Sequence, residues 1–161
     1  MDKISTLVTK KIITVHADEK IAFAAELMRE HNIRHLPVKD SLNRWVGILS
    51  DRDVLRAVIP VDVSENEGTF QYNDEHLVRY FMSWPIRSVS MNDTVDYIAK
   101  LMINEKISCF LVVDVFSMEP EGIITTEDLM KYLLKASQKL PQFLNEPIRN
   151  IFEFLPVPTY E

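Results

Sequence analysis

The chain has 161 residues, 18 of them basic and 24 acidic, and carries a formal net charge of −6. Apolar residues make up 47% and charged residues 26%, which excludes intrinsic disorder, and 3 glycines exclude a collagen-like chain. The acidic balance argues against nucleic-acid binding, which needs a basic face. One cysteine allows no internal disulfide, and we find neither a signal peptide nor a membrane-length apolar run. We therefore expect a cytoplasmic protein without a membrane partner.

The sequence repeats itself at a spacing of 74 residues, which places Ile12 on Ile86 and Asp40 on Asp114. One additional residue in the second copy then shifts the match by one position. A copy of roughly 50 residues is too small to bury a stable core alone. We therefore expect the two copies to pack together and to cover each other's apolar sheet face.

Apolar periodicity and turn residues predict the same order of elements, β-α-β-β-α, in both copies. In the first copy we predict a strand at 12–15, a helix capped by Asp18, strands at 36–38 and 45–49, and a helix at 52–58. In the second copy we predict a strand at 86–89, a helix capped by Asn92, strands at 110–113 and 122–125, and a helix at 127–134.

The copies and the segments around them predict four regions. They are a first repeat at 1–60, an acidic linker at 61–77, a second repeat at 78–136, and a C-terminal extension at 137–161. The extension is rich in proline but also apolar, so we expect it to pack on the body or on a second subunit.

A short motif ends a predicted strand and opens a predicted helix in each copy. A hydroxyl side chain, Ser50 or Thr125, is followed three residues later by a carboxylate, Asp53 or Asp128, which is the pattern of a helix capping box. The same geometry suits a ligand, because a helix N-terminus attracts anions and a carboxylate accepts both hydroxyls of a ribose. The ligand interpretation gains weight because the motif occurs at equivalent places in both copies.

The chain resembles a tandem pair of CBS domains, also called a Bateman module. The resemblance rests on the segments 47–53 and 122–128, which read Gly-apolar-X-Ser/Thr-X-X-Asp, and on the strand region 33–40. It implies an α+β fold of two pseudo-symmetric β-α-β-β-α repeats packed sheet to sheet. It also implies a regulatory homodimer that binds AMP, ADP, ATP or S-adenosylmethionine between its repeats and signals to an effector protein. No catalytic residue, metal or further cofactor is expected.

The resemblance further implies two pseudo-symmetric ligand sites, each built from both repeats. The implied contacts are the ribose acceptors Asp53 and Asp128, the nearby hydroxyls Ser50 and Thr125, the base-pocket residues Thr14 and Ser88, and the phosphate contacts Arg34 and His35.

The second copy lacks the basic pair Arg34 and His35 of the first copy, because Ser108 and Cys109 occupy the equivalent positions. We expect Arg34 and His35 to serve the site at Asp128, and at most one of the two sites to bind strongly. An Asp128→Ala change should then weaken binding more than the same change in the first copy. The alternative is a structural or dimerisation module whose degenerate sites stay empty.

Overall fold

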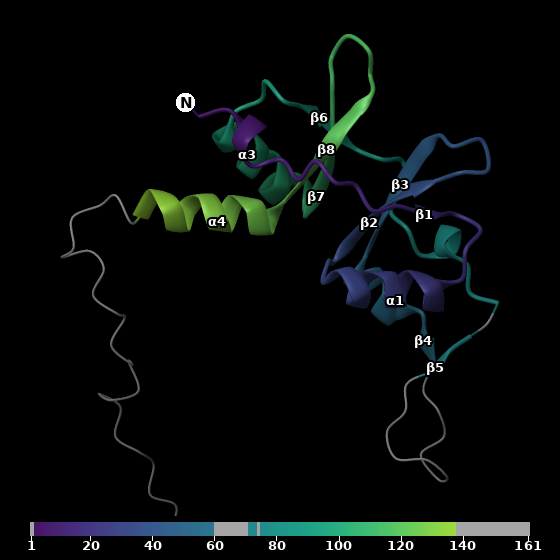
Figure 1. The fold of residues 1–161 in the computed structure, drawn as a ribbon. Helices are drawn as coiled ribbons and strands as arrows, with labels where there is room; N and C mark the ends of the chain where they lie inside the picture. Colours follow the sequence, from purple (N-terminus) through teal and green to yellow (C-terminus); the bar gives the residue numbers. More distant parts are fainter. Residues whose placement is uncertain (1, 60–70, 74, 138–161) are drawn as a thin grey trace, which may run out of the picture.

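The computed structural model describes residues 2–59, 71–73 and 75–137, and contains two three-stranded sheets with their helices (Figure 1). The α+β fold of two β-α-β-β-α repeats is confirmed. The first repeat consists of β1 (Val15–His16), α1 (Ile21–His31), β2 (His35–Lys39), β3 (Trp45–Ser50) and α2 (Asp51–Arg56). The second consists of β6 (Ser88–Ser90), α3 (Val95–Glu105), β7 (Cys109–Val113), β8 (Pro120–Thr125) and α4 (Thr126–Ser137). The other elements are the 3-10 helices Ile4–Thr6 and Val78–Tyr80 and the strand pair β4 (Val58–Ile59) and β5 (Gln71–Tyr72).

The two sheets share one topology. In each, the first strand pairs parallel to the second, and the second pairs antiparallel to the third. The parallel pair needs a crossover connection, which α1 and α3 supply. An irregularity interrupts both antiparallel ladders at equivalent places, Val38/Lys39 and Val112/Val113. The second repeat therefore duplicates the first down to the register of its strands.

The helices α1 and α3 begin later than the sequence predicts. The predicted caps Asp18 and Asn92 are wrong, since Lys20 and Thr94 occupy the N-cap positions. Asp18 instead forms an ion pair with Arg79, and Asn92 lies in a turn closed by side-chain hydrogen bonds to backbone amides. Short polar side chains favour such turns as well as helix caps, which explains the error.

The short segment before each repeat packs into the core of the other repeat. Ile4 is fully buried in the core of the second repeat, and its N–H donates to the Asp93 carbonyl over 3.0 Å. Val78 is equally buried in the core of the first repeat. Each core is therefore completed by a residue from the segment that precedes the other repeat.

A third apolar cluster lies between the two sheets, as expected for repeats packed sheet to sheet. Its buried members come from β3, β7 and β8, and are Ile48, Cys109, Leu111, Val113 and Ile123. This cluster holds β3 of the first repeat against the second repeat. It thereby positions the β3–α2 junction next to residues of the other sheet.

Close backbone approach at the edges of these sheets requires two glycines. A Cβ at Gly47 would lie 2.6 Å from the carbonyl oxygen of Ser83, and one at Gly122 would lie 2.6 Å from that of Thr9. Ser83 and Thr9 belong to segments that cross from one repeat to the other and form bridge pairs with the neighbouring strands. The glycines of the two sequence motifs therefore have a structural role in joining the repeats.

Parts of the predicted domain plan lie outside the described residues. The linker predicted at 61–77 is described only at 71–73 and 75–77, and the extension predicted at 137–161 only at Ser137. Within the part of the chain that the structure describes, no helix combines the length and the apolar character that a bilayer span requires.

Candidate functional site

The first strand-to-helix junction, between β3 and α2, is closed by a complete capping box. Asp53 Oδ2 accepts hydrogen bonds from the Ser50 backbone N–H over 2.8 Å and from its hydroxyl over 2.7 Å. The Asp53 N–H in turn donates to Ser50 Oγ over 3.3 Å. The capping interpretation is therefore confirmed, and it uses only one of the two carboxylate oxygens.

The second junction, between β8 and α4, repeats this geometry. Asp128 Oδ2 accepts from the Thr125 N–H over 2.8 Å and from its hydroxyl over 2.7 Å. The other carboxylate oxygens differ. Asp53 Oδ1 accepts from the Arg56 guanidinium over 2.6 Å, whereas Asp128 Oδ1 accepts no hydrogen bond from any residue that the structure describes.

A cavity of about 320 Å³ lies beside the first junction and joins the two repeats. It brings together three of the predicted site residues, namely Ser50, Asp53 and His35. The remaining lining residues are Ile48, Arg52, Arg56, Ser83, Pro85, Ile86, Arg87, Lys106, Ile107, Ser108 and Cys109. The cavity therefore combines the first repeat's motif with the start of the second repeat's sheet.

Four arginine or lysine residues line the cavity, namely Arg52, Arg56, Arg87 and Lys106, and none of them is among the predicted site residues. Arg56 is paired with the Asp53 carboxylate, and Arg87 forms an ion pair with Glu105 over 2.5 Å. Arg52 and Lys106 form no ion pair within the described residues. The sequence offered one signal for the first repeat's pair, since Arg52 and Arg56 flank the motif carboxylate on a short helix. For Arg87 the family resemblance implied a place beside the base pocket, as the neighbour of Ser88, and for Lys106 the sequence offered no signal.

His35 is buried and links the two repeats across the cavity. Its Nε2 lies 2.7 Å from Ser108 Oγ, and the residue is 8% exposed. Burial lowers the pKa of His35 below its usual value of 6.5, although the Asp51 carboxylate opposes this effect. We expected His35 to serve Asp128, but it lines the cavity beside Asp53.

This burial predicts that His35 makes the protein less stable in mild acid. Because the folded-state pKa is lowered, the unfolded chain binds the proton more tightly, so stability is lost as the pH falls below about 6.5. Denaturant unfolding at pH 7.5 and 5.5 should show a smaller acid-induced loss for His35→Gln than for the original chain. Ser108→Ala keeps the buried imidazole and should retain the loss. Equal losses in the original chain and His35→Gln would contradict the prediction.

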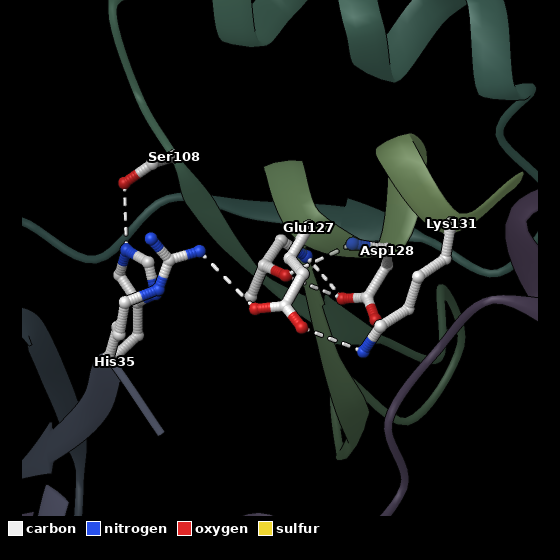
Figure 2. A network of polar contacts seen from close by, with 7 residues as sticks. His35, Ser108, Glu127, Asp128 and Lys131 are labelled. Atoms are coloured by element: carbon white, nitrogen blue, oxygen red, sulfur yellow. Dashed lines mark hydrogen bonds and ion pairs between the residues drawn. The ribbon is translucent and has the colours of Figure 1, made fainter. Parts of the chain in front are cut away.

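At the second junction, Glu127 joins two basic side chains (Figure 2). Its Oε2 lies 3.2 Å from an Arg34 guanidinium nitrogen, and its Oε1 lies 2.8 Å from Lys131 Nζ. The hydrogen bond from Lys131, followed by the contribution of Arg34, lowers the pKa of Glu127. The adjacent residues Arg34 and His35 therefore have different partners: Arg34 contacts Glu127, and His35 contacts Ser108.

The two predicted base-pocket residues do not line the cavity. Thr14 is half-buried just before β1, and Ser88 is exposed at the start of β6. The two residues that precede Ser88, Ile86 and Arg87, do line the cavity. Cys109 is buried there, and desolvation raises the pKa of its thiol to about 12, so it is not activated as a nucleophile.

Comparison with known proteins matches these features to one family. The sequence model of the CBS domain matches residues 4–60 and 78–135. The CBS domain pair of protein MJ0100, solved with 5′-methylthioadenosine and S-adenosylmethionine, is 26% identical, with a TM-score of 0.67, over 84% of this chain and 98% of that chain. A conserved CBS domain protein of unknown function from Thermoplasma acidophilum, TA0289, is also 26% identical, with a TM-score of 0.68, over 84% of this chain and 71% of that chain.

Some curated relatives are enzymes, but the similarity covers only a small part of them. L-aspartate semialdehyde sulfurtransferase of Methanocaldococcus jannaschii is 28% identical over 80% of this chain and 22% of its own length. An uncharacterised 17.7 kDa protein of Acidianus ambivalens is 29% identical over 82% of this chain and 73% of its own length. This chain therefore spans about a fifth of the enzyme and most of the small protein. The family matches coincide with the two structural repeats, and the chain belongs to the CBS-domain family as a tandem pair of CBS domains.

Proposed function

We propose that this CBS pair is a non-catalytic regulatory module that binds an adenosine ligand carrying phosphate, such as AMP or ADP, in the cavity beside Asp53. The observation that carries the proposal is the cavity itself, which combines a motif carboxylate with basic side chains from both repeats. The related MJ0100 pair binds the adenosyl compounds 5′-methylthioadenosine and S-adenosylmethionine, which supports the adenosine part of the proposal.

The carboxylate of Asp53 is suited to the ribose of such a ligand. Its Oδ2 serves the capping box, while Oδ1 accepts one hydrogen bond from Arg56. A carboxylate oxygen has two lone pairs, so Oδ1 can accept a further hydrogen bond from a ribose hydroxyl.

The charge of the cavity favours phosphate over a cationic sulfonium group. Arg52 and Lys106 come from different repeats and form no ion pair within the described residues. Phosphate oxygens accept charge-assisted hydrogen bonds from such groups, whereas a sulfonium cation would be repelled. Of the ligands that the family resemblance implies, we therefore propose AMP or ADP ahead of S-adenosylmethionine.

Binding between the repeats would transmit a signal through linkage. A ligand that contacts both repeats stabilises the arrangement that presents both sets of contacts, and so shifts the equilibrium between arrangements. We propose that the signal passes to a second copy or to an effector protein in the cytoplasm. Exposed apolar side chains on α4, namely Met130, Leu133 and Leu134, support such an interface.

A structural module with empty sites is the second candidate, and one observation favours it. Both motif carboxylates serve capping boxes, and Asp53 is also paired with Arg56. These roles would account for the motifs without a ligand.

A thermal unfolding series distinguishes the two functions. AMP or ADP at about 100 times its dissociation constant should add about 2.7 kcal/mol of stability, which raises the Tm by roughly 5–10 °C for a chain of this size. We expect smaller shifts with adenosine and S-adenosylmethionine at equal concentration. No shift with any adenosyl compound would favour the structural module. A shift with S-adenosylmethionine alone would refute the phosphate preference, and nucleotide turnover in the same samples would refute the non-catalytic assignment.

A further inference from the structure

The two motif junctions share their geometry but differ in charge. The two hydrogen bonds that each motif carboxylate accepts have the same lengths at both junctions, 2.8 and 2.7 Å. At the spacing of 75 residues, Arg52 of the first junction corresponds to Glu127 of the second, and Arg56 corresponds to Lys131. One acidic side chain therefore stands where the other junction has a guanidinium.

Glu127 holds the two cations of the second junction that would otherwise be available to an anion. Arg34 reaches it from the first repeat at 3.2 Å. Lys131 reaches it from its own helix at 2.8 Å (Figure 2). A carboxylate and a phosphate present similar oxygen acceptors to an arginine or lysine. The Glu127 side chain thus occupies the cations that a bound phosphate group would contact.

We propose that Glu127 is a specificity-determining residue that confines phosphate binding to the Asp53 junction, so that the chain binds one nucleotide instead of two. A phosphate at the second junction would have to displace Glu127 from both cations and then lie near two carboxylates, those of Glu127 and Asp128. Repulsion between these like charges opposes binding. This inference rests on the proposed nucleotide-binding function.

The motif carboxylate of the second junction keeps an acceptor for a ribose hydroxyl, so the charge of Glu127 is the difference to be tested. Asp128 Oδ1 accepts no hydrogen bond from the described residues, because Lys131 is directed to Glu127 instead. Figure 2 shows Lys131 reaching Glu127 beside the Asp128 carboxylate. Removing the charge of Glu127 should therefore free Arg34 and Lys131 to bind a phosphate group.

Isothermal titration of the full chain with AMP tests this inference. The original chain should bind one AMP, whereas Glu127→Gln, which keeps the shape and removes the charge, should bind two. Glu127→Arg, which copies the first junction, should bind the second AMP more tightly than Glu127→Gln does. Glu26→Gln is a matched control, since it also removes an exposed carboxylate paired with an arginine, and it should leave the stoichiometry at one.

A combined variant assigns the new event to its junction. Adding Asp128→Ala to Glu127→Gln should abolish the second event and leave the first. One AMP in both the original chain and Glu127→Gln would overturn the role of Glu127 and leave the proposed function intact. Binding of two AMP molecules with equal affinity by the original chain would also overturn the role of Glu127. If the original chain binds no AMP, the Asp53 site is refuted. AMP binding by Glu127→Gln alone would then still support the exclusion of phosphate by Glu127. If neither chain binds AMP, both proposals are refuted.

Discussion

An Ile4→Ala variant is expected to lose about 2–5 kcal/mol of unfolding free energy, the usual cost of deleting a buried isoleucine side chain beyond its Cβ. Ile4 is 0% exposed and packs among the buried residues of the second repeat's core, although it precedes the first repeat in sequence. The Ile4 backbone N–H donates a hydrogen bond to the Asp93 carbonyl, which holds the segment in place after the side chain is shortened. If the neighbouring side chains do not move into the space left by Ile4, the loss of unfolding free energy should lie near the upper end of this range.

Urea denaturation measures the effect of this substitution. The midpoint should fall with little change in the dependence on denaturant, as expected when stability changes but the exposed surface does not. Ser5→Ala is the control, because Ser5 is exposed in the same 3-10 helix. A loss below about 1 kcal/mol, less than the lower limit for such a core deletion, would show that Ile4 does not complete the second core.

The second large effect is expected on ligand binding. Asp53→Ala should weaken AMP binding by on the order of tenfold to a hundredfold, because a hydrogen bond to a charged group contributes about 1.5–3 kcal/mol and 1.4 kcal/mol is tenfold. Asp128→Ala should weaken it by less than about twofold. We expected the reverse order from the sequence, and we reverse it because the cavity and its basic side chains lie beside Asp53.

These two variants control for each other in titration calorimetry. Each loses a carboxylate that accepts the same two capping hydrogen bonds, while Asp53→Ala also loses the ion pair with Arg56, so the unfolding free energy of both variants is measured alongside the titration. A difference in AMP affinity then reports on the ligand and not on folding. Equal weakening by both variants, or greater weakening by Asp128→Ala, would refute the assignment of the nucleotide to the Asp53 cavity.

Local chemistry explains why much of the fold could be predicted. The apolar periodicity of each helix, the β-rich runs and the hydroxyl-carboxylate spacing are all properties of neighbouring residues, and they occur in both copies. The junctions at Ser50 and Thr125 accordingly form with the predicted capping hydrogen bonds. Helix starts were less predictable, because Asp18 and Asn92 have the residue types of both caps and turns.

The sequence therefore sufficed to identify the duplication, the order of elements and the two motif junctions, since these depend on interactions within a few residues. It did not reveal that Ile4 and Val78 each complete the other repeat's core, or that Arg87 and Lys106 line one cavity with Asp53. Arg34 and His35 show why: they are neighbours at the start of a strand, where successive side chains point to opposite sides. One contacts Glu127 and the other Ser108, and these contacts exist only once two sheets pack together.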